Sequence, residues 1–214
     1  MNRRLLLHLL VTAILLAPAE LAQTWEAGAA IGFGFYHDAS LTGPTTSGRA
    51  GFGDRFVLSA MFGHSLGQRF SIEGRYTFQD GDPEIVSGTS RANLDGDSSS
   101  LLAEIVFSPF RRHAWIRPYL AAGGGMKIYR GSGTPAAVEP LMDLAVLHSA
   151  TDAVGLFTYG GGVKFRLSRH LWLRLDLRDY TTPFPTRVIT PAPGVKVGGW
   201  LHDFVPTLGL SWGR

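Results

Sequence analysis

A strict two-residue alternation over residues 171–180 constrains the fold of this chain more than any other feature. One face would carry four leucines, and the other would carry tryptophan, tyrosine and three charges: Leu171, Leu173, Leu175 and Leu177 against Trp172, Arg174, Asp176, Arg178 and Tyr180. Successive side chains of a β-strand point to opposite faces, so the segment is predicted as a strand between two different environments.

Seven other segments show the same period, around residues 25–36, 56–63, 70–79, 100–108, 115–130, 157–166 and 203–212. Hydrophobic residues make up 45% of the chain. Even so, no stretch after residue 20 approaches the run of about 18 apolar residues that a membrane helix needs. The apolar residues are spread by alternation, and the sequence predicts an all-β fold of eight antiparallel strands.

The composition of the two faces indicates which of them lies inside. The polar face consists of glycine, serine, alanine and charges of both signs, which suits a narrow packed interior. The apolar face carries aromatic residues near strand ends, as at a membrane interface; they are Trp25, Phe35, Tyr76, Phe78, Trp115, Phe157 and Trp212. We therefore expect lipid outside. A soluble lipocalin-like carrier, with its apolar faces turned inward, is the alternative.

The connections alternate in length. Short turns are expected at residues 65–68, 109–114 and 167–170, and long loops near 37–54, 80–97, 131–153 and 182–199. Outer-membrane barrels of the up-and-down type have short periplasmic turns and longer extracellular loops. The sequence thus predicts an eight-stranded antiparallel up-and-down transmembrane β-barrel with four long extracellular loops and both termini on the short-turn side.

The first residues have the pattern of a cleavable signal peptide. Arg3 and Arg4 precede an apolar core from Leu5 to Leu16, and residues 17–19 form an A-x-A cleavage signal. We predict a signal peptide over residues 1–19, with cleavage up to residue 22 as the alternative, and a barrel domain over 24–214. The expected route is general secretion, and the absence of cysteine suits passage through an oxidising periplasm.

Three short runs resemble small outer-membrane barrels of the OmpA membrane-domain and OmpX type, the outer-membrane β-barrel domain family. They are Arg117–Tyr119 before Gly123–Gly125, Gly160–Lys164, and Arg174, Asp176, Arg178, Asp179 and Tyr180. The resemblance spans nearly the whole mature chain. It implies a place in the outer membrane, contact with its lipids and lipopolysaccharide, and assembly by the barrel-assembly machinery. Such chains usually end on phenylalanine, whereas this one ends Trp212, Gly213, Arg214. The peptidoglycan-binding role of OmpA-type proteins is not expected here.

Twelve charged residues are predicted to point into the lumen. Unpaired buried ions cost several kcal/mol, so we expect a structural plug of salt bridges. The alternative is a narrow passive channel with an anion preference. The residues are Glu26, Glu73, Arg75, Glu104, Arg117, Lys127, Lys164, Arg166, Arg174, Asp176, Arg178 and Asp203.

Two groups outside the lumen raise the question of metals and lipids. The second long loop contains Asp80, Asp82, Glu84, Asp95 and Asp97, but it lacks the ordered EF-hand pattern, so we expect a flexible solvated loop and no metal site. Metal bridging to lipopolysaccharide is the alternative. The short turns contain basic residues that suit phospholipid head groups or are ordinary turn residues: Arg69, Arg111, Arg112, His113, Arg169 and His170.

No catalytic signature stands out. His64 and His148 each precede a serine, but neighbours on a strand point to opposite faces, which is poor geometry for a nucleophile and its base. A lipid A-modifying enzyme is therefore the weakest alternative. The net charge of +3 is not gathered in one run, so no nucleic-acid partner is expected. We expect a non-enzymatic barrel without cofactors, with an envelope-structural or surface-interaction role.

Overall fold

A computed structural model describes residues 25–53, 55–110, 114–134 and 141–213. Both predicted ends of the signal peptide lie outside these residues, so its cleavage stays a prediction. Among the described residues, no helix is long and apolar enough to span a bilayer.

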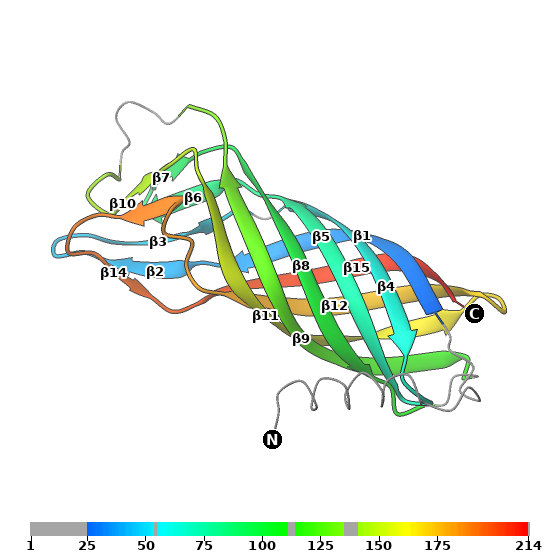
Figure 1. The fold of residues 1–214 in the computed structure, drawn as a ribbon. Helices are drawn as coiled ribbons and strands as arrows, with labels where there is room; N and C mark the ends of the chain where they lie inside the picture. Colours follow the sequence, from blue (N-terminus) through cyan, green and yellow to red (C-terminus); the bar gives the residue numbers. More distant parts are fainter. Residues whose placement is uncertain (1–24, 54, 111–113, 135–140, 214) are drawn as a thin grey trace, which may run out of the picture.

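Eight long strands close into one barrel, shown in Figure 1. They are β1 (Trp25–His37), β4 (Arg55–Ser65), β5 (Phe70–Asp80), β8 (Gly96–Phe107), β9 (Ile116–Gly131), β11 (Thr151–Arg166), β12 (Leu171–Thr182) and β15 (Leu201–Gly213).

Each barrel strand pairs with the next one along the chain, always antiparallel, and β1 closes the cylinder against β15. In that closing seam Ala27 lies opposite Trp212 and Ile31 lies opposite Leu208. The strand number, the order and the antiparallel direction confirm the up-and-down barrel predicted from the alternation.

The apolar face of the barrel is the convex one. On β12, Leu175 and Leu177 are 45% and 53% exposed, whereas Arg174 and Arg178, which flank them, are almost wholly buried. The predicted orientation of the two faces is therefore confirmed. A lipocalin-like carrier would need these leucines inside, so that alternative is wrong.

Exposed aromatic residues gather toward the two ends of the outer wall. Trp25, Phe70 and Trp212 lie at the turn end, and Phe35, Phe157 and Phe204 lie at the opposite end. Between them the exposed residues include several leucines and isoleucines. An apolar band with an aromatic girdle at each edge is the surface that a bilayer requires of a spanning barrel.

The long connections contain β-strands and do not form open loops. Five short strands make a second sheet in the order β14-β2-β3-β6-β7, and two others pair as β10-β13. Their bounds are β2 (Ala39–Thr42), β3 (Ser47–Phe52), β6 (Pro83–Ser87), β7 (Ser90–Asn93), β10 (Ala145–Leu147), β13 (Ile189–Pro191) and β14 (Lys196–Gly198). In Figure 1 they lie together beyond the end of the barrel that is farthest from the C-terminus. We call this assembly the cap.

The cap has an apolar core of its own. Leu41 and Ala50 of the first connection, Ile85 of the second, Leu144 of the third and Ile189 of the fourth are all completely buried in one cluster. Each connection thus contributes side chains to a core shared by all four. The expectation of a flexible solvated loop over residues 80–97 is wrong, because β6 and β7 pair there and Ile85 is buried in the cap.

Replacing Leu175 by arginine tests which solvent bathes the outer wall. Leu175 lies outward in the middle of β12. The variant Leu175→Arg is expected to lower the free energy of unfolding in lipid vesicles by about 2–4 kcal/mol, because the charge would face hydrocarbon. Leu66→Arg is the control, since Leu66 is similarly exposed but lies in a turn beyond β4. Equal effects of the two substitutions in a urea titration would show that lipid does not contact Leu175.

Candidate functional site

The lumen is crossed by ion pairs between opposite walls. In the closed order of strands, β5 and β12 are four positions apart, which places them on opposite sides of the barrel. Arg174 Nη1 of β12 lies 2.8 Å from Glu73 Oε2 of β5, and Arg75 Nη2 of β5 lies 3.5 Å from Asp176 Oδ1 of β12. Arg75 also pairs with Glu73 at 2.7 Å. These four side chains therefore span the full width of the interior.

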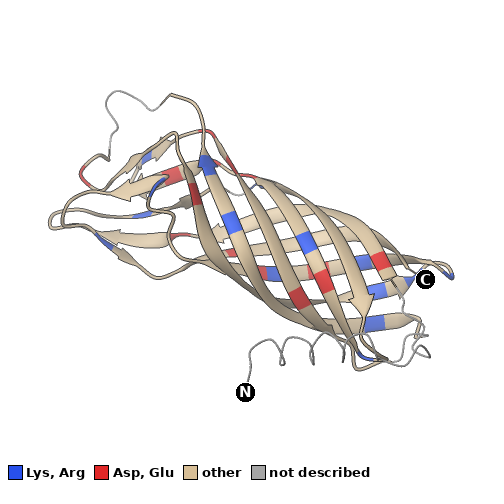
Figure 2. Ribbon diagram, in the orientation of Figure 1, with Lys and Arg blue, Asp and Glu red and all other residues tan. Residues whose placement is uncertain are grey.

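Further groups extend this crossing along the barrel axis. Arg178 Nε donates to Glu104 Oε1 at 2.9 Å. Tyr119 donates its hydroxyl hydrogen to Asp176 and accepts a hydrogen bond from Arg174 Nη2 at 3.0 Å. The side chains of Arg174, Asp176, Arg178 and Glu104 are at most 1% exposed. Charges of both signs lie along the strands in Figure 2. Buried ions in this number are tolerable only because they are paired.

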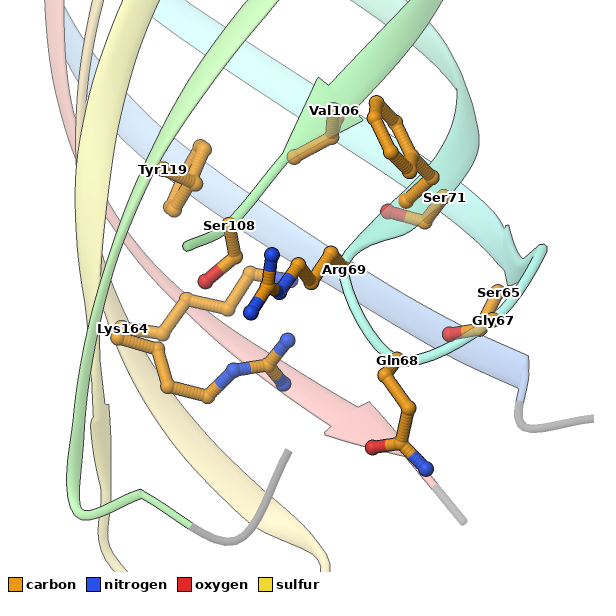
Figure 3. Close-up of a pocket in the computed structure, with 11 residues that line it drawn as sticks. Ser65, Gly67, Gln68, Arg69, Ser71, Val106, Ser108, Tyr119 and Lys164 are labelled. Atoms are coloured by element: carbon orange, nitrogen blue, oxygen red, sulfur yellow. The ribbon is translucent and has the colours of Figure 1, made fainter. Parts of the chain in front are cut away.

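A second cluster of ion pairs lies at the turn end of the lumen. Lys164 Nζ lies 2.5 Å from Glu26 Oε2, and Arg174 Nη1 lies 3.2 Å from Glu26 Oε1. Beyond it, Arg69 and Lys164 line the same small pocket, shown in Figure 3. Its volume of about 20 Å³ leaves space for a single molecule the size of water.

The cap end of the lumen has its own buried pair. Lys127 Nζ lies 2.6 Å from Asp203 Oδ2, and both side chains are about 1% exposed. Lys127 also stands over the Tyr36 ring, 4.8 Å from its centroid. Gln79 donates to Asp203 Oδ1 at 3.3 Å, and a Tyr129–Thr182 hydrogen bond of 2.8 Å lies next to the cap core.

Glycines on the inner face make room for these long side chains. A Cβ atom built on Gly162 would lie 2.6 Å from the Tyr119 hydroxyl oxygen, and one built on Gly160 would lie 3.1 Å from Arg178 Cδ. Both distances are shorter than carbon usually tolerates, so a larger residue would displace the network. Gly160 and Gly162 are therefore needed on the inner face, because a larger side chain at either position would collide with the network.

Ten of the twelve charged residues predicted to face the lumen take part in these ion pairs, five carboxylates with five cations. The other two are Arg117 and Arg166, both at the turn end and both half-buried. The Arg117 guanidinium stands over the Trp172 ring at 5.7 Å. The two remaining basic residues therefore lie at one mouth of the lumen rather than along its length.

Three of the five acidic residues of the second connection form ion pairs with arginines. Asp82 pairs with Arg55 at 2.5 Å, and Asp97 pairs with Arg130 at 3.8 Å. Glu84 pairs with Arg91 at 3.5 Å. In the described part of the chain, no three histidine or acidic side chains gather as a metal site would require.

The two histidines that precede serines have different contacts, one through its side chain and one through its backbone. His64 packs on the Trp25 ring with centroids 4.3 Å apart, and the backbone N–H of His148 donates to Val188 O at 2.8 Å.

One polar cluster on the outer wall was missed by the sequence reasoning. Asp179 faces outward, yet its side chain is only 3% exposed. Its Oδ2 accepts a hydrogen bond from the Tyr159 hydroxyl at 2.6 Å and lies 2.9 Å from His202 Nδ1. A signal was present in the sequence, because position 179 continues the outward series of leucines from 171 to 177. An aspartate in that series breaks the apolar pattern.

This outer cluster does not have the geometry of a catalytic triad. A relay needs a hydroxyl on one ring nitrogen of histidine and a carboxylate on the other. Here Thr181 Oγ1, at 3.3 Å, and Asp179 Oδ2 both lie against Nδ1 of His202. The arrangement therefore anchors the imidazole ring without activating a nucleophile.

Known proteins share this architecture. The model of the outer membrane protein β-barrel domain family matches residues 7–196. Among solved structures, OprG of Pseudomonas aeruginosa matches with a TM-score of 0.59 at 10% identity, covering 90% of this chain and 96% of that one. Neisserial surface protein A matches with a TM-score of 0.53 at 11% identity, covering 88% and 96%. No curated protein sequence matches the chain.

The family model covers most of the chain, and each of the two structural matches covers more than eight-tenths of both chains. At these identities the solved structures establish the fold alone. The fold, the apolar outer band and the family model agree, and they confirm the predicted place of the protein in the bacterial outer membrane. The chain belongs to the outer membrane protein β-barrel domain family.

Proposed function

We propose that this protein is a non-enzymatic, non-conducting barrel that displays a folded cap on the cell surface and has a structural or surface-interaction role in the envelope. The observation that carries the proposal is the ion-pair network between opposite walls, above all Arg174–Glu73 at 2.8 Å. It is supported at the two ends by Lys164–Glu26 and Lys127–Asp203.

The network opposes ion flow for an electrostatic reason. A permeating ion needs water or polar groups that exchange readily, whereas each of the five lumenal carboxylates here already contacts a buried cation within 2.5–3.2 Å. Separating such a pair leaves an uncompensated buried charge, which is strongly unfavourable. The pocket of about 20 Å³ at the turn end also supports a non-conducting lumen, because it has room for only one molecule the size of water.

The difference in connection length supports an outward-facing cap. Four connections of β-structure lie at one end, and three short turns lie at the other. Barrels of the outer membrane place short turns in the periplasm and long connections outside. A cap with a buried core offers a rigid surface to partners. Lipopolysaccharide and outer-membrane lipids are the partners that we propose at its border with the membrane. The barrel-assembly machinery remains the proposed partner during biogenesis.

Planar-bilayer recording of the refolded, leader-free protein tests this function. The expected result is the absence of discrete conductance steps, with insertion verified by heat-modifiable gel mobility. Reproducible steps whose ion selectivity changes in Arg117→Ala would instead establish the narrow passive channel, because the Arg117 side chain lines the turn-end mouth. Either result is independent of which lipid the outer wall contacts.

A further inference from the structure

A recess of about 460 Å³ lies in the outer wall of the barrel between β11, β12 and β15. Gly161 forms part of its floor, Leu175 and Leu177 line it from β12, and Tyr159 and Phe204 line its cap end. All of these residues lie on the face of the barrel that contacts the bilayer. The recess is therefore filled by lipid in the membrane, and the question is whether it selects one.

The floor of the recess is kept bare by the backbone. A Cβ atom on Gly161 would lie 2.7 Å from the backbone oxygen of Tyr119 on the neighbouring strand, closer than carbon approaches an oxygen in proteins. No larger side chain fits there without a shift of β9 or β11. The surrounding outward residues are large, so the missing side chain produces a groove with apolar walls, as an acyl chain requires.

Asp179 lies in the lining of the recess and gives it a polar end. Ionisable residues on a lipid-facing wall are costly and mark functional sites when they occur. Oδ2 of Asp179 is satisfied by Tyr159 and His202. Its other oxygen, Oδ1, is buried and has no hydrogen-bond partner in the structure. A buried carboxylate oxygen without a donor is unfavourable. Because Oδ1 is closed off in the structure, an N–H or O–H group from outside the chain reaches it only when the Asp179 side chain turns toward the recess that it lines.

We propose that the recess binds one lipid A-type glycolipid, with an acyl chain in the groove over Gly161 and an amide N–H or hydroxyl of the lipid donating to Asp179 Oδ1. The position of the Asp179 carboxylate along the membrane normal favours this class of lipid. Asp179 is two residues from the lipid-facing Leu177 and is paired across the sheet with Tyr159 and Phe204, which also face lipid. The donor must therefore lie where the acyl chain is attached. Amide-linked hydroxyacyl chains have donors at that level. The ammonium of phosphatidylethanolamine lies beyond its phosphate.

This inference rests on the proposed function in one respect. If the cap faces outward, the cap end of the barrel lies in the outer leaflet, where lipid A is found. The two ideas fail separately, since the conductance of the lumen decides the first and lipid selectivity of the wall decides the second.

Competition binding in detergent micelles tests the site. Fluorescently labelled lipid A is titrated with the refolded protein and then displaced by unlabelled lipid A, phosphatidylethanolamine or phosphatidylcholine. Wild-type protein is expected to bind one lipid A and to prefer it over both phospholipids. Asp179→Asn keeps the shape of the side chain but removes its charge, and Leu177→Trp blocks the groove while leaving Asp179 in place. Each is expected to weaken binding about tenfold or more.

Leu210→Trp is the matched control, because Leu210 is an outward leucine of similar exposure on β15 that does not line the recess. It should bind like the wild type. Unchanged affinity in Asp179→Asn and Leu177→Trp would overturn the proposal, as would equal displacement by phosphatidylcholine, which offers no donor. Stronger displacement by phosphatidylethanolamine would overturn the choice of lipid. Should Asp179→Asn fail to refold, Leu177→Trp still decides whether the groove binds.

Discussion

Replacing Arg174 by alanine is expected to destabilise the barrel by about 3–5 kcal/mol, the cost of removing one partner from a buried ion-pair network. Arg174 is completely buried and contacts Glu26, Glu73 and Asp176. Without its guanidinium, Glu73 retains only Arg75 at short range, and the interior gains an uncompensated negative charge. Reversible unfolding in urea with the protein in lipid vesicles measures the change.

Arg130→Ala is the control for Arg174→Ala. Arg130 pairs with Asp97 at 3.8 Å, and its side chain is 53% exposed. Exposed pairs contribute about 0–1 kcal/mol, so the control should unfold almost like the wild type. Arg174→Ala with unchanged stability would mean that water fills the lumen and screens Glu73.

Replacing Lys127 by methionine is the second large effect that we expect. Lys127 is the cation next to Asp203 at 2.6 Å, and both lie at the cap end of the lumen. Methionine keeps much of the volume but leaves Asp203 with hydrogen bonds from neutral groups such as Gln79. The loss should again be about 3–5 kcal/mol in the same unfolding assay.

The double variant Lys127→Met with Asp203→Asn distinguishes charge from shape. Removing both charges leaves no buried ion at this layer, so most of the lost stability should return. A double variant as unstable as the sum of the two single variants would show that the ammonium is needed for packing, for example against the Tyr36 ring, and not for neutralising Asp203.

The strands and their faces were predictable because alternation is local. Leu175, Leu177 and Arg178 show their opposite environments within four residues, and no knowledge of distant segments is needed. The predicted lumenal set was also accessible in this way. Its pairing was not, because Arg174 and Glu73 are 101 residues apart and meet only once the register of every intervening strand is set.

The cap could not be read from the sequence for a related reason. Leu41, Ile85, Leu144 and Ile189 lie in four separate connections, each rich in glycine, serine or proline, and none of these segments has a core alone. The barrel brings the four connections together, and only then is a shared apolar interior possible. Asp179 lies next to three charged residues of the inner face, Arg174, Asp176 and Arg178, so the run of charges alone does not show that its odd position places it outside.

Spin-label accessibility on β15 tests the central claim, that lipid contacts one face of the sheet and a dry plug occupies the other. The chain has no native cysteine, so single cysteines can be introduced at Thr207, Leu208, Leu210 and Ser211. The first and last face inward, and the two leucines face outward. Labels at 208 and 210 should be reached by oxygen dissolved in the bilayer, and labels at 207 and 211 by neither oxygen nor a water-soluble nickel complex. Nickel access at 207 and 211 would contradict the account, because it would show a water-filled lumen.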